Sequence, residues 1–546
     1  MSTITTEQRF VLETIAGVET DRETLDAVLE GVAEFAAGEW APLNRAGDTV
    51  GAKWTADGVM MPDGYRAAYQ AYVDGGWGTV GVAEEWGGMG LPFAVQCAVL
   101  ETLGTANMGF ALAPILTVGA IEALAHHGSP EQQALYLAKL ATGEWTGTMN
   151  LTEPQAGSDV GALRATATPR GDGTFSVKGT KIYISFGDHD LTDNIVHLVL
   201  ARTPNAPPGT RGISLFLVPK VRVDGTRNDV RVVSIEHKMG LHALPTCVLA
   251  FGDNDDCVGE LIGAEFGGIR AMFTMMNNAR LNVGLQGVQV AEGATRRAAA
   301  YARERVQGAR AGAPSAIVDH PDVRRMLMRM RAQTEAARAL VYYAAGQVER
   351  AGAGNASARE RLELLTPLAK AHATDLGNEV ASLGIQVHGG MGYVEETGAA
   401  QFFRDARITP IYEGTNGIQA ADLVGRKLAM ANGGTFAALI EDLRGGEHAR
   451  LSALVDACDR VGRTLQTADA DDKLAASYPF LTMLSVATCG WLLAREAAAV
   501  GDDAFGTAKR ATAAFYLDQI VPEALGMEAA ASQRADQLYA IPADAL

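Results

Sequence analysis

The segment Ile411–Gly417, with the sequence Ile-Tyr-Glu-Gly-Thr-Asn-Gly, contains the residue best suited to acid–base chemistry. Apolar residues precede Glu413, and Gly414 after it leaves room for a flat ligand to approach. Desolvation raises the pKa of a carboxyl group because it penalises the anion. A carboxyl group with a raised pKa can act as a general base near neutral pH. The sequence therefore predicts that Glu413 is a general base.

The residues after Glu413 predict the start of a helix. Thr415 or Asn416 can cap it, and Asn416 also fits the first position of a capping box. The free N–H groups of such a terminus can bind an anion or a carbonyl oxygen. The alternative is a buried loop in which Glu413 is paired with Arg404 or Arg407, which are close in sequence.

Length and composition limit the class of protein. At 546 residues the chain is too long for one core, and roughly three or four domains are expected. The net charge of -18 argues against a general nucleic-acid binder and favours a cytoplasmic protein. Five cysteines without a CxxC pair indicate free thiols. The longest apolar run, Pro479 to Leu493, is short for a membrane span and predicts a buried helix; no membrane partner and no metal site are expected.

The periodicity of the apolar residues divides the chain into four parts. Residues 1–145 have helical spacing, and residues 146–260 alternate as a set of short strands typical of a small antiparallel barrel or sandwich. Within that set, Phe175 to Ile184 is interpreted as a hairpin. Helical spacing returns over residues 264–432, and residues 433–546 add a further helical domain. The predicted fold class is mainly α with a central β domain.

Two loops in the strand region have the composition of ligand-binding turns. In residues 151–159, Pro154 and Gly157 favour a turn, and Thr152 and Ser158 supply hydroxyl groups beside exposed N–H groups. Residues 183–187 place an aromatic ring and a hydroxyl group at the end of a strand.

Six segments, taken in order across about residues 60 to 430, resemble the acyl-CoA dehydrogenase family. They are Leu151–Asp159, Lys181–Ser185, Arg305–Gly308, Gln386–Tyr393, Arg404–Ala406 and Tyr412–Thr415. The resemblance implies a helical domain, a central β domain and a four-helix bundle. It also implies FAD as the cofactor and an acyl-CoA as the substrate.

By this resemblance, Glu413 removes the α-proton of the thioester while the β-hydrogen leaves as hydride to the flavin N5, giving the trans-2-enoyl-CoA. The residues implied in FAD binding are Leu151, Thr152, Gly157, Ser158, Tyr183, Ser185, Arg305, Gln307, Gln386, Gly389, Gly390, Thr415 and Asn416. Those implied in substrate binding are Ser158, Asn277, Arg280 and Gly414.

The chain departs from the family pattern at a few positions. It lacks the usual aromatic residue between Gln307 and Gly308, and Tyr183 stands where tryptophan is common. Some relatives place the base on the bundle helix near Ala279, but alanine cannot serve, which leaves Glu413.

The part after residue 433 resembles a C-terminally extended subgroup that includes methylthiopropionyl-CoA dehydrogenases, so 3-methylthiopropionyl-CoA or a fatty acyl-CoA is the expected substrate. The expected electron acceptor is an electron-transfer flavoprotein. An acyl-CoA oxidase using O₂ and an alkylation-response DNA-associated flavoprotein are the alternatives; acidic residues in the extension argue against the latter. Members of the family without the extension form tetramers in which two dimers meet at their bundle faces. The apolar helices of the extension are expected to cover that face in this chain, so a homodimer is expected.

Overall fold

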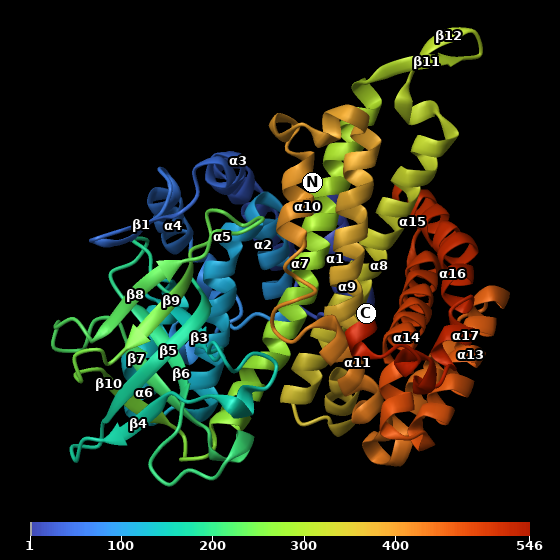
Figure 1. Cartoon of the computed structure of the whole chain (residues 1–546). Coiled ribbons are helices and arrows are strands. Elements are labelled where there is room, and N and C mark those ends of the chain that lie inside the picture. Colours follow the sequence, from blue (N-terminus) through green and yellow to red (C-terminus); the bar gives the residue numbers. More distant parts are fainter. Residues whose placement is uncertain (1–2) are drawn as a thin grey trace. The chain divides into compact units, whose positions relative to one another are not determined.

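A computed structural model describes residues 3–546, without the side chains of residues 273–277. The chain forms two compact units (Figure 1). We name Glu30–Ala279 the sheet unit, and Met1–Leu29 together with Arg280–Leu546 the bundle unit. The predicted class, mainly α with a central β domain, is confirmed.

The sheet unit is an eight-stranded sheet with helices before it. Its strands follow the order β3-β6-β7-β10-β5-β9-β8, and β4 pairs with β5. The β3–β6 pair is parallel, in contrast to the expected all-antiparallel arrangement. Apolar side chains such as Val177, Val199 and Phe216 form its buried core. The strands are β3 (Thr146–Asn150), β4 (Thr166–Pro169), β5 (Phe175–Ser185), β6 (Ile195–Ala201), β7 (Ser214–Pro219), β8 (Val230–Ile235), β9 (Thr246–Phe251) and β10 (Val258–Ile262).

The predicted hairpin over Phe175 to Ile184 is wrong, because these residues form one long strand, β5. Gly179, at φ 155°, lets the strand approach Ala165 closely: a Cβ at this glycine would lie 2.7 Å from the Ala165 Cβ. The glycine therefore serves a close backbone contact rather than a turn.

Helices precede the sheet, and a short hairpin lies between them. They are α2 (Arg22–Phe35), α3 (Ala41–Val50), β1 (Lys53–Thr55), β2 (Gly58–Met60), α4 (Tyr65–Asp74), α5 (Phe93–His127) and α6 (Pro130–Thr142). Helix α6 begins with the capping box of Ser129 and Gln132, with Pro130 in its first turn.

The bundle unit is built on long helices. Helix α7 enters it from the sheet unit, and α8 and α9 pack against each other along their length. Figure 1 shows the β11–β12 hairpin projecting beyond the end of α8. The elements are α1 (Thr3–Val11), α7 (Gly268–Glu304), β11 (Val306–Arg310), β12 (Ala313–Ala316), α8 (Pro321–Gly352), α9 (Ala356–His388), α10 (Ala399–Ala406) and α11 (Asn416–Gly425).

The C-terminal extension packs on the bundle within the same unit, and α14 contacts α8, α9 and α11. Its helices are α12 (Gly434–Arg444), α13 (Ala449–Thr467), α14 (Ala470–Ala499), α15 (Ala504–Phe515), α16 (Val521–Leu525) and α17 (Glu528–Ala531). The predicted buried helix at Pro479 to Leu493 lies inside α14, which has 30 residues. By length and composition α5 and α14 could span a membrane, but 89% and 78% of their most apolar windows are buried in the protein, as in core helices.

Candidate active site

The predicted base lies on a loop with an unusual backbone. Glu413 has φ 55° and Gly414 has φ 83°. A residue with a side chain in this left-handed region costs about 1–2 kcal/mol, so the surrounding structure must hold Glu413 in place. Glycine is favoured at the next position, because side chains rarely adopt a φ of 83°.

Helix α11 begins directly after this loop. Thr415 is its N-cap and accepts a hydrogen bond from the Ile418 N–H at 3.1 Å. The alternative prediction, that Asn416 caps the helix, is wrong. The Asn416 side chain turns to α9 instead, and its backbone N–H donates to the Pro410 carbonyl oxygen at 2.9 Å.

Burial raises the pKa of the Glu413 carboxyl, and the positive charges of Arg280 and Lys370 oppose that rise. The alternative pairing with Arg404 is wrong, because Arg404 forms an ion pair with Glu395 at 2.9 Å. Of the two cations, Arg280 was predicted near the substrate and Lys370 was not predicted at all. The signal for Lys370 is a lone lysine in the apolar stretch Leu364–Ala373.

The neighbours of Glu413 on α7 are polar and buried. The Tyr412 hydroxyl donates to the Gln286 side-chain oxygen. Burial raises the pKa of Tyr412, so its ring stays neutral. Arg280 is buried, and its Nε donates to no acceptor in the part of the chain that the structure describes. The predicted substrate residue Asn277 has a side chain outside the described residues.

The predicted flavin loop, residues 151–159, is tied to β5 in the sheet unit. The Lys181 ammonium is fully buried and bonds the Glu153 carboxylate at 2.8 Å and the Leu151 carbonyl at 3.0 Å. The Ile182 N–H donates to the Thr152 carbonyl at 3.0 Å. This anchorage leaves Gly157 and Ser158 exposed on the outer side of the loop.

Strand β5 carries a bulge where it faces this loop. Its register with β9 shifts between Lys181 and Ile184, and Tyr183 has φ 61°. Bulges re-aim side chains, and here the Tyr183 ring is 62% exposed. Thr152 and Ser185 are half-buried here, and their hydroxyls suit the polar edge of a flat ring system, while the Ser158 hydroxyl is exposed.

The remaining predicted cofactor residues form a second group in the bundle unit. Arg305 and Gln307 lie at the base of the β11–β12 hairpin and are exposed. Gln386, Gly389 and Gly390, at the end of α9, are also exposed. The two helix ends adjoin each other, because the Tyr301 and His388 rings stack with centroids 4.4 Å apart. An exposed arginine beside open glycines is a suitable anion site.

Family models match almost the whole length of the chain. Those of the acyl-CoA dehydrogenases match the N-terminal domain at residues 22–144, the middle domain at 148–254 and the C-terminal domain at 267–428. An acetyl-CoA dehydrogenase C-terminal-like model matches residues 423–542. The chain belongs to the acyl-CoA dehydrogenase family.

Single members of the family are similar along most of the chain. A 3-methylmercaptopropionyl-CoA dehydrogenase of Ruegeria pomeroyi is 45% identical, covering 94% of this chain and 92% of its own. A solved structure titled for the electron transferring flavoprotein of Acidaminococcus fermentans is 30% identical, with TM-score 0.63. The match covers 74% of this chain and 97% of the solved one. An acyl-CoA dehydrogenase of Bacillus anthracis complexed with FAD has TM-score 0.79 at 23% identity. The match covers 97% of this chain and 93% of the solved one. The chain is an FAD-dependent oxidoreductase that acts on acyl-CoA.

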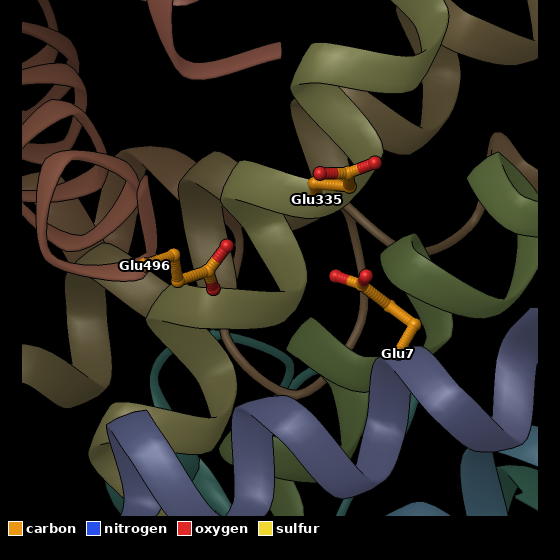
Figure 2. Close-up of side chains that lie close together, drawn as sticks. All are labelled: Glu7, Glu335 and Glu496. Carbon is orange, nitrogen blue, oxygen red and sulfur yellow. The ribbon is translucent and has the colours of Figure 1, made fainter. Parts of the chain in front are cut away.

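One further cluster has the composition of a metal site. Figure 2 shows Glu7, Glu335 and Glu496 pointing toward one another. The Lys509 ammonium forms ion pairs with all three, at 2.7 Å to Glu7 and 2.9 Å to Glu335. The lysine therefore supplies the cation that these carboxylates need.

Proposed function

We propose that this chain oxidises an acyl-CoA thioester to the trans-2-enoyl-CoA, with Glu413 as the base that takes the α-proton. The observation that carries this proposal is the partly buried carboxyl on its strained loop, with a raised pKa and two cations nearby. Burial makes the carboxylate more basic, and the two cations favour its ionised form, which is the form that accepts a proton.

The same loop offers a hydrogen-bond donor for the thioester oxygen. The Glu413 N–H donates to no acceptor among the described residues. A donor fixed in advance stabilises the negative charge that develops on the oxygen when the α-proton leaves. FAD, when bound, accepts the β-hydrogen as hydride. Leu151, Thr152, Tyr183 and Ser185 would meet its ring system, and Ser158 its phosphate or the CoA portion of the substrate. The phosphates and adenosine would be bound by Arg305, Gln307, Gln386, Gly389 and Gly390.

The substrate and the acceptor follow from the relatives. The similarity to the Ruegeria pomeroyi enzyme supports 3-methylthiopropionyl-CoA, and a fatty acyl-CoA is the other candidate. The electron-transfer flavoprotein title of a similar structure supports that protein as the acceptor. A panel of acyl-CoAs, assayed with and without an electron-transfer flavoprotein and with peroxide measured, separates these possibilities.

The test of the base is Glu413→Gln, which keeps the size and hydrogen bonding of the side chain. The variant should retain its FAD and fold and lose ~10²–10⁴-fold in turnover. Glu441→Gln is the matched control, since Glu441 is 78% exposed on α12. Retention of more than about a tenth of the activity would show that another group is the base.

A further inference from the structure

A line of hydrogen bonds runs from the C-terminal extension to the loop that carries Glu413. The Tyr478 hydroxyl, on α14, donates to the Asp375 Oδ2 at 2.6 Å. The Asp375 Oδ1 accepts from the Asn416 Nδ2 at 2.8 Å. The Asn416 Oδ1 accepts from the Lys370 Nζ at 2.8 Å. Four side chains from α14, α9 and α11 are thereby joined.

Asn416 is the point at which this line holds the loop. Its Nδ2 also bonds the Ala371 carbonyl at 3.1 Å and the Thr374 hydroxyl at 3.0 Å, and the residue is 3% exposed. Its own N–H bonds the Pro410 carbonyl, so both ends of the loop are tied together. The strained backbone at Glu413 lies between these two ends. The Asn416 side chain therefore anchors the loop through its hydrogen bonds to α9.

We propose that Tyr478 is a positioning residue for the base: through Asp375 and Asn416 the C-terminal extension fixes the loop on which Glu413 stands, and Lys370 is the buried cation of the same line of contacts. The inference rests on Glu413 being the base. It gives the extension a part in catalysis as well as in covering the bundle.

The hydroxyl matters because it supports the charge on Asp375. Burial raises the pKa of the Asp375 carboxyl, and the Tyr478 and Asn416 donors with the cations Lys370 and Arg407 oppose that rise. If the Tyr478 donor is removed, Asp375 takes up a proton more readily. A neutral Asp375 is a weaker acceptor for Asn416, so the anchor loosens.

The charges around Lys370 connect this anchor to the base. Glu413 and Asp375 favour the charged lysine, while burial and Arg280 of α7 disfavour it, and its pKa is lowered to about 8. Arg280 in turn faces Asp422 and Arg426 of α11. Without Lys370, Glu413 keeps Arg280 as its cation, and the pKa of the base rises.

The test compares Tyr478→Phe with Tyr516→Phe in the FAD-bound enzyme. Both variants lose one hydroxyl from a tyrosine in the extension, but the Tyr516 hydroxyl bonds neither α9 nor α11 in the described chain. Tyr478→Phe should lower kcat about tenfold with KM unchanged. It should also speed amide hydrogen exchange in residues 411–416 by a similar factor, while the melting midpoint stays with that of the control.

Two further variants complete the experiment. Asp375→Asn should repeat the faster exchange, and it serves if Tyr478→Phe folds poorly. Lys370→Met should move the acidic limb of the kcat–pH profile upward by about one unit. If Tyr478→Phe and Asp375→Asn match Tyr516→Phe in both exchange and kcat, the extension does not position the loop. An active Glu413→Gln variant would instead show that Glu413 is not the base. The hydrogen-exchange data would still test whether Tyr478 and Asp375 hold the loop in place.

Discussion

Two buried lysines of the bundle unit are held in opposite ways. Lys509, on α15, is 1% exposed and forms ion pairs with Glu7 of α1, Glu335 of α8 and Glu496 of α14. Burial alone would lower the pKa of its ammonium, but the three carboxylates outweigh burial and raise it. This lysine therefore stays charged at any physiological pH.

Lys370, on α9, is just as buried but has a weaker set of partners. Its ammonium bonds the amide oxygen of Asn416 at 2.8 Å, and the carboxylates of Glu413 and Asp375 offset only part of the cost of burial. The pKa of Lys370 is consequently lowered to about 8.

The difference separates a charge that joins elements from a charge that can act on a reaction. The partners of Lys509 neutralise it and connect three helices that are far apart in sequence. The charge of Lys370 is only partly compensated, so its field reaches Glu413. In a low-dielectric interior that field is a strong influence on the base.

The largest expected effect is on the three-carboxylate cluster. Lys509→Met removes the buried cation that Glu7, Glu335 and Glu496 share, so the free energy of unfolding should fall by about 3–5 kcal/mol. Denaturant titration measures this, and kcat per folded molecule should remain that of the unchanged enzyme. Lys178→Met is the control, because Lys178 pairs with Asp255 at the surface and its side chain is 61% exposed. An equal loss in both variants would contradict the comparison.

A second effect concerns the protons of the same cluster. The pKa of Glu496 is raised to about 8 because burial outweighs the Lys509 charge. The folded state therefore holds a proton that the unfolded state has already released, and stability falls between pH ~4.5 and ~8 at up to about 1.4 kcal/mol per unit. Glu496→Gln should remove this slope. The free energy of unfolding of the variant, relative to that of the unchanged protein, should therefore rise from pH 6 to pH 8. Parallel stability curves would show that Glu496 is ionised throughout.

The sequence was sufficient for features that depend on local pattern. Helical and alternating spacing predicted the order of helices and strands, and an apolar setting predicted a raised pKa for Glu413, which the structure bears out. The motif spacing marked the family. The hairpin prediction failed at Gly179, because a glycine required by Ala165 has the same appearance in sequence as a turn glycine.

Features that depend on contacts between distant segments could not be predicted. Asn416 fitted a helix cap in the sequence, yet its side chain donates a hydrogen bond to α9, and Thr415 caps the helix. Lys370 and Tyr478 carry no local signal of their partners, which lie on other helices. Only the packing of α9, α11 and α14 brings these groups together.

A third effect concerns the pH dependence of Lys370. Its pKa is about 8 in the folded protein and 10.5 in the ordinary reference state. Between these values the unfolded state binds the extra proton, so this group adds stability as the pH rises from 8 to 10.5. Lys370→Met should abolish that gain, which is seen as the difference between the two stability curves. An unchanged difference across this window would mean that Lys370 is as well paired as Lys509.

The substitution of an exposed cation should have no effect on stability, unlike the substitution of the buried Lys509 or Lys370. Arg305 is exposed at the end of α7, so Arg305→Ala should leave the melting midpoint of the apoprotein unchanged. The same variant should retain less FAD through gel filtration, because the guanidinium is proposed to neutralise phosphate charge. Arg303→Ala, an exposed arginine two residues earlier on α7, is the control and should keep its flavin. A full complement of FAD in Arg305→Ala would remove Arg305 from the cofactor site, whereas a lowered apoprotein midpoint would show that this exposed charge is structural after all.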